Sequence, residues 1–329
     1  MAQRPSDDEG DDFADLRPES VPTTRLPIAG AGDLLSDRPT LPVVGPADPV
    51  DLADPPKPPR FRAGRDLQAA VLVAVVLLAA IALSLFAYRP SFAWIVGIAV
   101  VYGCWELTSA VAAADVRAAF VPIAVGGICE FVAAWKRGPD GLVIAFFVTA
   151  CGVLIWRLAD GARHYLRDVG VSLFLLLYLP TLAGFAVLMV HPRDGAARII
   201  AFIVVVVCSD TGGYFTGVLF GRHPLAPIVS KGKTWEGAAG SVSWCAVAGV
   251  LFFTLTFHEA WWQGLLFGAA IAVTAMLGDL GESLIKRDIG VKDMGSLLPG
   301  HGGLMDRLDS LLPCAAVAYL LLAAFHPVG

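Results

Sequence analysis

Long apolar runs separated by short polar loops dominate the chain from Leu67 onward. As helices, these runs are long enough to cross the roughly 30 Å of hydrocarbon in a bilayer. Nine such runs occur, at residues 67–87, 92–113, 118–135, 141–157, 169–190, 197–219, 235–257, 262–283 and 308–326. The third and fourth give the weakest signal, because each is short or carries a charged residue near one end. The pattern predicts an all-α, polytopic integral membrane protein with about nine transmembrane helices.

The first 65 residues lack this pattern. They are rich in Pro, Asp and Arg, show no apolar periodicity, and contain no short apolar core of the kind that marks a signal peptide. Such a composition buries too little apolar surface to offset the entropy lost on folding. We therefore predict a disordered cytoplasmic tail at residues 1–65 and a membrane-embedded catalytic domain at residues 66–329.

The composition also favours a membrane protein over a soluble domain. Of the 329 residues, 56% are apolar and 16% are charged, whereas soluble domains average about 25% charged residues. The mean hydropathy is +0.68. The six cysteines stand singly, without the spacing of a metal site, and we interpret them as small apolar packing residues. We expect no nucleic-acid partner.

Basic residues are distributed unequally between the two sides of the predicted bundle. With the N-terminus inside, fifteen fall on the cytoplasmic side and five outside, and the ratio is eight to five without the loops at 220–234 and 284–307. The positive-inside rule therefore predicts a cytoplasmic N-terminus, an external C-terminus and both of these loops in the cytoplasm. The cytoplasmic group includes Arg117, Arg157, Arg163 and Arg167. We expect a multi-pass protein of the plasma membrane.

Three acidic residues lie inside predicted membrane helices, away from the helix ends. Asp210 lies among small residues in the sixth helix, and Glu106 and Glu130 lie in the second and third. An ionisable side chain at membrane depth is costly and is a functional candidate by default. Each of the three could also serve as a hydrogen-bonded packing residue, and for the two glutamates that alternative stays open.

The loop before the seventh helix carries Ser230, Lys231, Lys233 and Thr234. Lysines beside the amides of a helix N-terminus attract phosphate. Gly232-Lys-Thr resembles the end of a P-loop, but that pattern requires glycine at position 227, where this chain has Pro227. The alternative is a positively charged membrane anchor with a helix cap.

The densest group of charged residues lies between Leu277 and Ser310. Asp279 closes the eighth helix, and Asp306 and Asp309 open the ninth, three residues apart. Hard carboxylate oxygens suit Mg²⁺, which takes one or two of them together with substrate phosphates. The same stretch also contains Glu282, several glycines, and the bases Lys286, Arg287, Lys292 and Arg307. Juxtamembrane salt bridging between these acids and bases is the alternative to a metal and phosphate site.

In these residues the chain resembles the phosphatidate cytidylyltransferases, or CDP-diacylglycerol synthases. The signature reads Ser283, Lys286-Arg287, Lys292-Asp293, His301-Gly302-Gly303 and Asp306-Arg307-Leu308-Asp309, and a second block reads Asp210-Thr-Gly-Gly-Tyr-Phe and Lys233-Thr-Trp-Glu-Gly. The resemblance covers about residues 67–329. One departure is Ser230-Lys-Gly-Lys-Thr, where the family often has Ser-Pro-Lys-Lys-Thr.

The resemblance implies a reaction in which CTP and phosphatidate give CDP-diacylglycerol and pyrophosphate. It implies Mg²⁺, with a second cation as a further possibility, held by Asp279, Asp306 and Asp309. The implied catalytic residues are Asp210, Asp279, Asp306, Asp309, Lys286 and Arg287. The implied substrate-binding residues are Ser230, Lys233, Thr234, Glu236, Lys292, His301 and Arg307. The expected partners are CTP, phosphatidate and membrane lipids, and a homodimer is one possible assembly.

Two other classes of function fit part of the same pattern. A polyprenol kinase would also use CTP at a membrane. A cation-coupled transporter would explain the intramembrane acids, but such proteins usually contain two similar halves, and no internal repeat is evident here. A non-catalytic scaffold would leave the group of acids and bases without a role.

Overall fold

The computed structural model describes residues 76, 79–227, 229–291, 294–295 and 303–327. The predicted tail at 1–65 lies outside these residues. Seven helices in the described part are long and apolar enough to cross a membrane. They occupy Pro90–Ala112, Phe120–Leu158, Tyr165–Val190, Gly195–Phe220, Trp235–Thr256, Trp261–Asp288 and Met305–Phe325. The all-α, polytopic prediction is therefore confirmed, while the count of nine is approximate.

The third and fourth predicted helices are the two arms of one element, α3 (Phe120–Leu158). Gly138 adopts a φ of 66° and a ψ of −149° between them, a conformation that glycine adopts readily. Pro139 follows and is suited to the first turn of the second arm. The arms pack so closely that a Cβ on Gly126 would collide with the side chain of Thr149. Of the first predicted helix, the described residues 79–87 are helical.

The fifth predicted helix is also interrupted. It consists of α4 (Tyr165–Leu176), the π-helical turn η1 (Leu177–Thr181) and α5 (Leu182–Val190). Pro180 lies inside η1 and cannot donate a backbone hydrogen bond. The Thr181 hydroxyl donates to Glu130 Oε2 on α3 over 2.9 Å. This bond favours the packing interpretation of Glu130.

The buried apolar side chains form two clusters. One contains residues of α6 (Gly195–Phe220), α7 (Trp235–Leu251), the π-turn η2 (Phe252–Thr256), α8 (Trp261–Asp288) and α10 (Leu311–Phe325). The other contains residues of α2 (Pro90–Ala112), α3, α4 and η1. Helix α5 contributes side chains to both clusters and so joins them.

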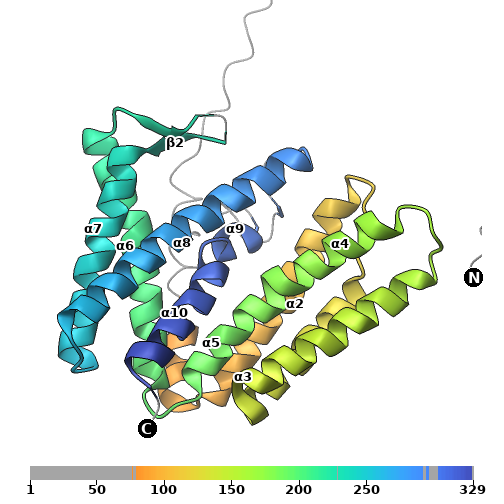
Figure 1. Ribbon diagram of the computed structural model, residues 1–329, viewed down its shortest axis with the longest axis horizontal. Helices are drawn as coiled ribbons and strands as arrows, with labels where there is room; N and C mark the ends of the chain where they lie inside the picture. Colours follow the sequence, from red (N-terminus) through yellow and green to blue (C-terminus); the bar gives the residue numbers. More distant parts are fainter. Residues whose placement is uncertain (1–75, 77–78, 228, 292–293, 296–302, 328–329) are drawn as a thin grey trace, which may run out of the picture. The chain divides into compact units, whose positions relative to one another are not determined.

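Glycines bring α6, α7 and α8 into close contact. A Cβ on Gly264 of α8 would collide with the Gly249 backbone of α7, and one on Gly240 of α7 would collide with Thr216 of α6. Small residues permit this spacing between membrane helices. Figure 1 shows the three helices side by side, with a short β-hairpin at one end of α6 and α7. The hairpin pairs β1 (Pro224–Ala226) with β2 (Ser230–Thr234) in antiparallel register and was not predicted from the sequence.

The packing of α3 makes a prediction for stability. Gly126→Ala inserts a methyl group against Thr149, and overpacking of this kind typically costs about 1–3 kcal/mol. Gly152→Ala on the second arm is the matched control, because its Cβ would meet nothing within 4 Å. We expect thermal unfolding in detergent at a lower temperature for Gly126→Ala only. Equal midpoints for the two variants would contradict this packing.

Candidate active site

A cavity of about 450 Å³ lies between α6, β2, α7 and α8. Small-molecule sites typically measure about 300–1,000 Å³. Its polar lining includes Asp210 from α6, Lys233 and Thr234 from β2, and Asp279 from α8. Asp210 interacts electrostatically with Asp279, Asp309, Lys233 and Arg307. Charged residues that are far apart in the sequence therefore lie around one cavity at the ends of the membrane helices.

The β-hairpin positions Lys233 over this cavity. The lysine forms an ion pair with Asp279, and its Nζ donates to the Met276 carbonyl over 3.5 Å. The Trp235 amide donates to the His223 carbonyl over 2.9 Å, which closes the hairpin where α7 begins. The lysine is thus held at the cavity wall while its charge is balanced by one carboxylate.

Two predicted substrate contacts have structural partners in the same loop. Thr234 caps α7, because its hydroxyl accepts from the Gly237 amide over 3.1 Å. Glu236 accepts from the backbone amides of Arg222 and His223, and its Oε1 lies 2.6 Å from His223 Nδ1. The cap considered in the sequence analysis is therefore present at Thr234, which also lines the cavity. Glu236 holds the loop and is not among the lining residues.

Three carboxylates beside the cavity are arranged as a metal site would require. Asp279 and Glu282 lie three residues apart on α8 and share a face with each other. Together with Asp309 they offer one oxygen each, all within 4.8 Å of one another. Glu282 and Asp309 are only 2% and 8% exposed. Glu282 Oε1 is buried and makes no hydrogen bond within the described part of the chain, so a hard divalent cation fits this donor set.

Asp306 lies beside this group without belonging to it. Its Oδ1 is 2.7 Å from Lys286 Nζ, and its Oδ2 accepts from the Gly303 amide over 2.7 Å. Lys286 also lies 2.7 Å from Glu282 Oε2 and so connects the two acids. The structure therefore brings Glu282, rather than Asp306, together with Asp279 and Asp309. The i, i+3 spacing of Asp279 and Glu282 was a sequence signal that pointed to this pair.

The remaining predicted site residues are distributed around this centre. Ser230 begins β2 and is partly buried. Arg287 near the end of α8 and Arg307 in α9 (Met305–Leu308) are exposed. Lys292 and His301 lie outside the described residues.

Glu106 of α2 supports the chain segment that leads into this site. Its Oε2 accepts from the Met305 amide over 2.8 Å. A Cβ on Gly295 or Gly303 would collide with the same carboxylate, so both positions require glycine for the observed approach. Met305, whose amide makes this contact, directly precedes Asp306 in the sequence. Glu106 therefore positions the segment that carries Asp306 and Asp309, a role that its place in an apolar helix alone could not specify.

Comparison with known proteins identifies a family and several similar proteins. Residues 68–325 match the profile of the cytidylyltransferase family. A protein of Mycobacterium leprae (strain TN) is 38% identical over 279 residues, which cover 79% of this chain and 89% of that protein. One of Mycobacterium tuberculosis (strain ATCC 25618 / H37Rv) is 38% identical over 275 residues, covering 79% and 84%. One of Brucella suis biovar 1 (strain 1330) is 34% identical over 187 residues, covering 56% and 66%. All three bear the name phosphatidate cytidylyltransferase.

The Glu106 contact predicts how the 303–309 segment exchanges its amide hydrogens. Glu106→Ala removes the acceptor of the Met305 amide. A hydrogen bond to a charged group typically contributes about 1.5–3 kcal/mol, so we expect local exchange of this segment to rise by about ten-fold or more. Ser109→Ala is the control, because that hydroxyl donates to the Trp105 carbonyl of its own helix and to no other residue that the structure describes. Unchanged exchange in Glu106→Ala would show that Glu106 does not hold the segment.

Proposed function

The chain belongs to the cytidylyltransferase family, and we propose that it acts as a phosphatidate cytidylyltransferase, making CDP-diacylglycerol and pyrophosphate from CTP and phosphatidate. The resemblance stated from its motifs is thereby confirmed at the level of the family. The observation that supports the proposed reaction most strongly is the meeting of Asp210, Lys233 and Asp279 around one cavity, beside the buried carboxylates of Glu282 and Asp309.

In this reaction an oxygen of the lipid phosphate attacks the α-phosphorus of CTP, and pyrophosphate leaves. Phosphoryl transfer of this kind depends mainly on positioning and on neutralising negative charge. A phosphate monoester is already an anion, so no general base is needed to activate it. The residues of the chain therefore have to hold two negatively charged substrates together.

Lys233 is the candidate for receiving the triphosphate. It lines the cavity, and in the described conformation its charge is balanced by Asp279. Binding of the nucleotide would allow the lysine to exchange this carboxylate for a phosphate oxygen. The exchange would leave Asp279 available to act together with Glu282 and Asp309.

We assign Mg²⁺ binding to Asp279, Glu282 and Asp309, whose carboxylate oxygens converge. When bound, such an ion neutralises phosphate charge and orients the reacting groups. Lys286 pairs with Oε2 of the Glu282 carboxylate and also with Asp306, so it connects the two acids. We therefore propose that Asp306 positions Lys286 and the Gly303 backbone, in place of the direct ligand role expected from the sequence.

The lipid would reach the cavity sideways from the bilayer. Tyr214 and Val218 of α6 line the cavity and are also exposed on the surface of the helix bundle. Acyl chains could remain beside these apolar side chains while the headgroup enters the polar part. The charge distribution of the loops supports a site that faces the cytoplasm, where CTP is available, in a protein of the plasma membrane.

Isotope labelling distinguishes this reaction from that of a CTP-dependent lipid kinase. We expect the purified protein, with Mg²⁺ and phosphatidate, to transfer label from [α-³²P]CTP into lipid and to leave the γ-label in pyrophosphate. A kinase would give the opposite pattern. Label entering lipid only from the γ-position would refute the proposal.

The same assay with Asp279→Asn tests the role of the cluster. The amide keeps the size of the side chain but removes the charge, and losing one electrostatic contact to a transition state typically costs about 10²–10³ in rate. We expect turnover to fall at least this far without a large change in the unfolding temperature. Asp140→Asn, an exposed acid in the second arm of α3, is the matched control and should remain active.

A further inference from the structure

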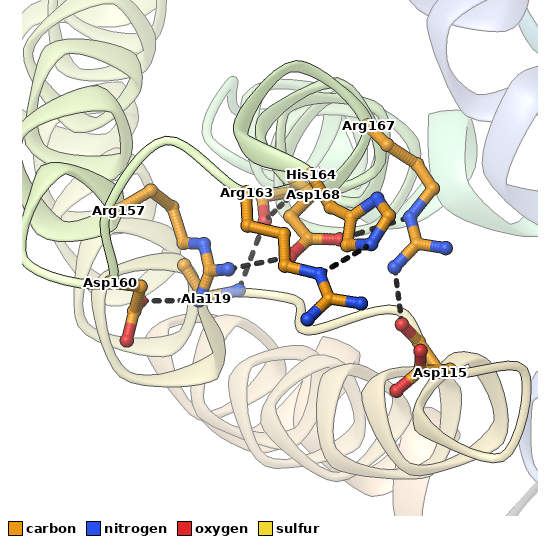
Figure 2. A network of polar contacts seen from close by, with 9 residues as sticks. Asp115, Ala119, Arg157, Asp160, Arg163, His164, Arg167 and Asp168 are labelled. Atoms are coloured by element: carbon orange, nitrogen blue, oxygen red, sulfur yellow. Dashed lines mark hydrogen bonds and ion pairs between the residues drawn. The ribbon is translucent and has the colours of Figure 1, made fainter.

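A second polar cavity of about 320 Å³ lies away from the site described above, where α2, α3 and α4 meet. It is enclosed by the link between α2 and α3, the end of α3 and the start of α4 (Figure 2). Its lining consists almost entirely of charged side chains, namely Asp115, Arg117, Arg157, Asp160, Arg163, His164, Arg167 and Asp168. We call it the arginine pocket. None of these residues lines the first cavity or belongs to its carboxylate group.

Arg157 is the most deeply buried of the arginines that line the arginine pocket. It is 5% exposed, and its two terminal nitrogens lie 2.5 Å from Asp160 Oδ2 and 2.6 Å from Asp168 Oδ2. Its Nε is buried and has no hydrogen-bond partner among the residues that the structure describes. An unpaired N–H donor of a buried cation is costly, and an acceptor that reached this atom would remove the cost.

Three further arginines surround this buried pair. Arg167 lies 3.3 Å from Asp168 Oδ1 and donates to the backbone carbonyl of Asp115. The Nε of Arg163 donates to the ring Nε2 of His164 over 3.4 Å. Arg117 and Arg163 form no ion pair with any carboxylate in the described part of the chain. Both are exposed, so two guanidinium groups remain available at the rim.

The backbone beside the pocket also favours an anion, in addition to the arginine side chains. Helix α4 begins at Tyr165 beside the pocket, and the residue before it, His164, gives it no side-chain cap. Free amides in the first turn of a helix attract anions. His164 and Asp115 both have a φ of 58°, in the left-handed region, so the two chain segments that border the pocket are held in an uncommon conformation.

We infer that the arginine pocket binds the phosphate group of an anionic ligand at the membrane surface, separately from the cytidylyl-transfer site. Two carboxylates are already engaged by Arg157, while its Nε donor has no partner and the Arg117 and Arg163 guanidinium groups have no carboxylate partner within the described residues. Planar guanidinium groups match phosphate oxygens in pairs. The phosphate could belong to a lipid headgroup or to a soluble anion, and the two share this recognition chemistry. The predicted cytoplasmic location of these arginines corresponds to the leaflet that is rich in anionic lipid.

The ion pairs also join α3 to α4, and this structural role does not require a ligand. The two roles are separable because Arg117 and Arg163 take no part in the carboxylate pairs. Replacing both with glutamine removes two positive charges from the rim while leaving the Arg157–Asp168 pair intact. Arg137→Gln, which removes an exposed arginine from the turn between the arms of α3, is the matched control.

The experiment measures thermal unfolding of the full-length protein in detergent during titration with three probes. These are phosphatidylglycerol, phosphatidylcholine and inorganic phosphate. A ligand that binds only the folded state raises the unfolding temperature with its concentration. We expect a saturable rise with phosphatidylglycerol, and an apparent affinity at least about ten-fold weaker in Arg117→Gln/Arg163→Gln than in Arg137→Gln.

Each outcome has a defined meaning. A rise with phosphatidylglycerol alone, weakened by the double variant, assigns the pocket to a lipid headgroup. A rise with inorganic phosphate that the double variant weakens to the same extent assigns the pocket to a soluble anion. Equal behaviour of the double variant and Arg137→Gln with every probe would overturn the inference, and so would an equal, variant-independent rise with phosphatidylcholine. The cytidylyl-transfer assay on the same preparations reports separately on the proposed function.

Discussion

Negative charge concentrated at the ends of apolar helices is the constraint on which the rest of this structure depends. The carboxylates of Asp279, Glu282 and Asp309 approach one another within 4.8 Å. Two of them are almost fully buried. Carboxylates at this spacing repel unless cations offset the charge, and in a water-poor environment the repulsion is stronger. The neighbouring lysines offset part of it, because Lys233 pairs with Asp279 and Lys286 pairs with Glu282.

The surrounding helices can be understood as the support for this arrangement. Asp279 and Glu282 are fixed by α8, which packs against α7 through glycine contacts close enough to exclude any side chain. Asp309 is fixed from the other side, because Glu106 holds the Met305 amide and the Asp309 carboxylate accepts from the Ser310 amide over 2.6 Å. A change in either support would alter the separation of the carboxylates without touching them.

The helices were predictable because the apolar runs and the glycine and proline at 138 and 139 are local features of the sequence. The charged residues that line the cavity stand out in the sequence for the same reason, since ionisable residues within apolar helices are rare. Other features depend on tertiary geometry. The β-hairpin forms because its strands pair between α6 and α7, which a polar loop does not reveal. That Glu282, and not Asp306, groups with Asp279 and Asp309 depends on how α8 faces the 303–309 segment. The hydrogen bond of Glu106 is made to a residue 199 positions away.

The central claim is that Asp279, Glu282 and Asp309 form a single divalent-cation site. Titration of the purified full-length protein with Mn²⁺, followed by electron paramagnetic resonance of the free ion, tests it without relying on activity. Glu282→Gln removes one ligand charge, and Asp140→Asn serves as the exposed control. We expect saturable binding in the wild type and the control, and more than about ten-fold weaker binding in Glu282→Gln. Identical Mn²⁺ binding by all three proteins would contradict it.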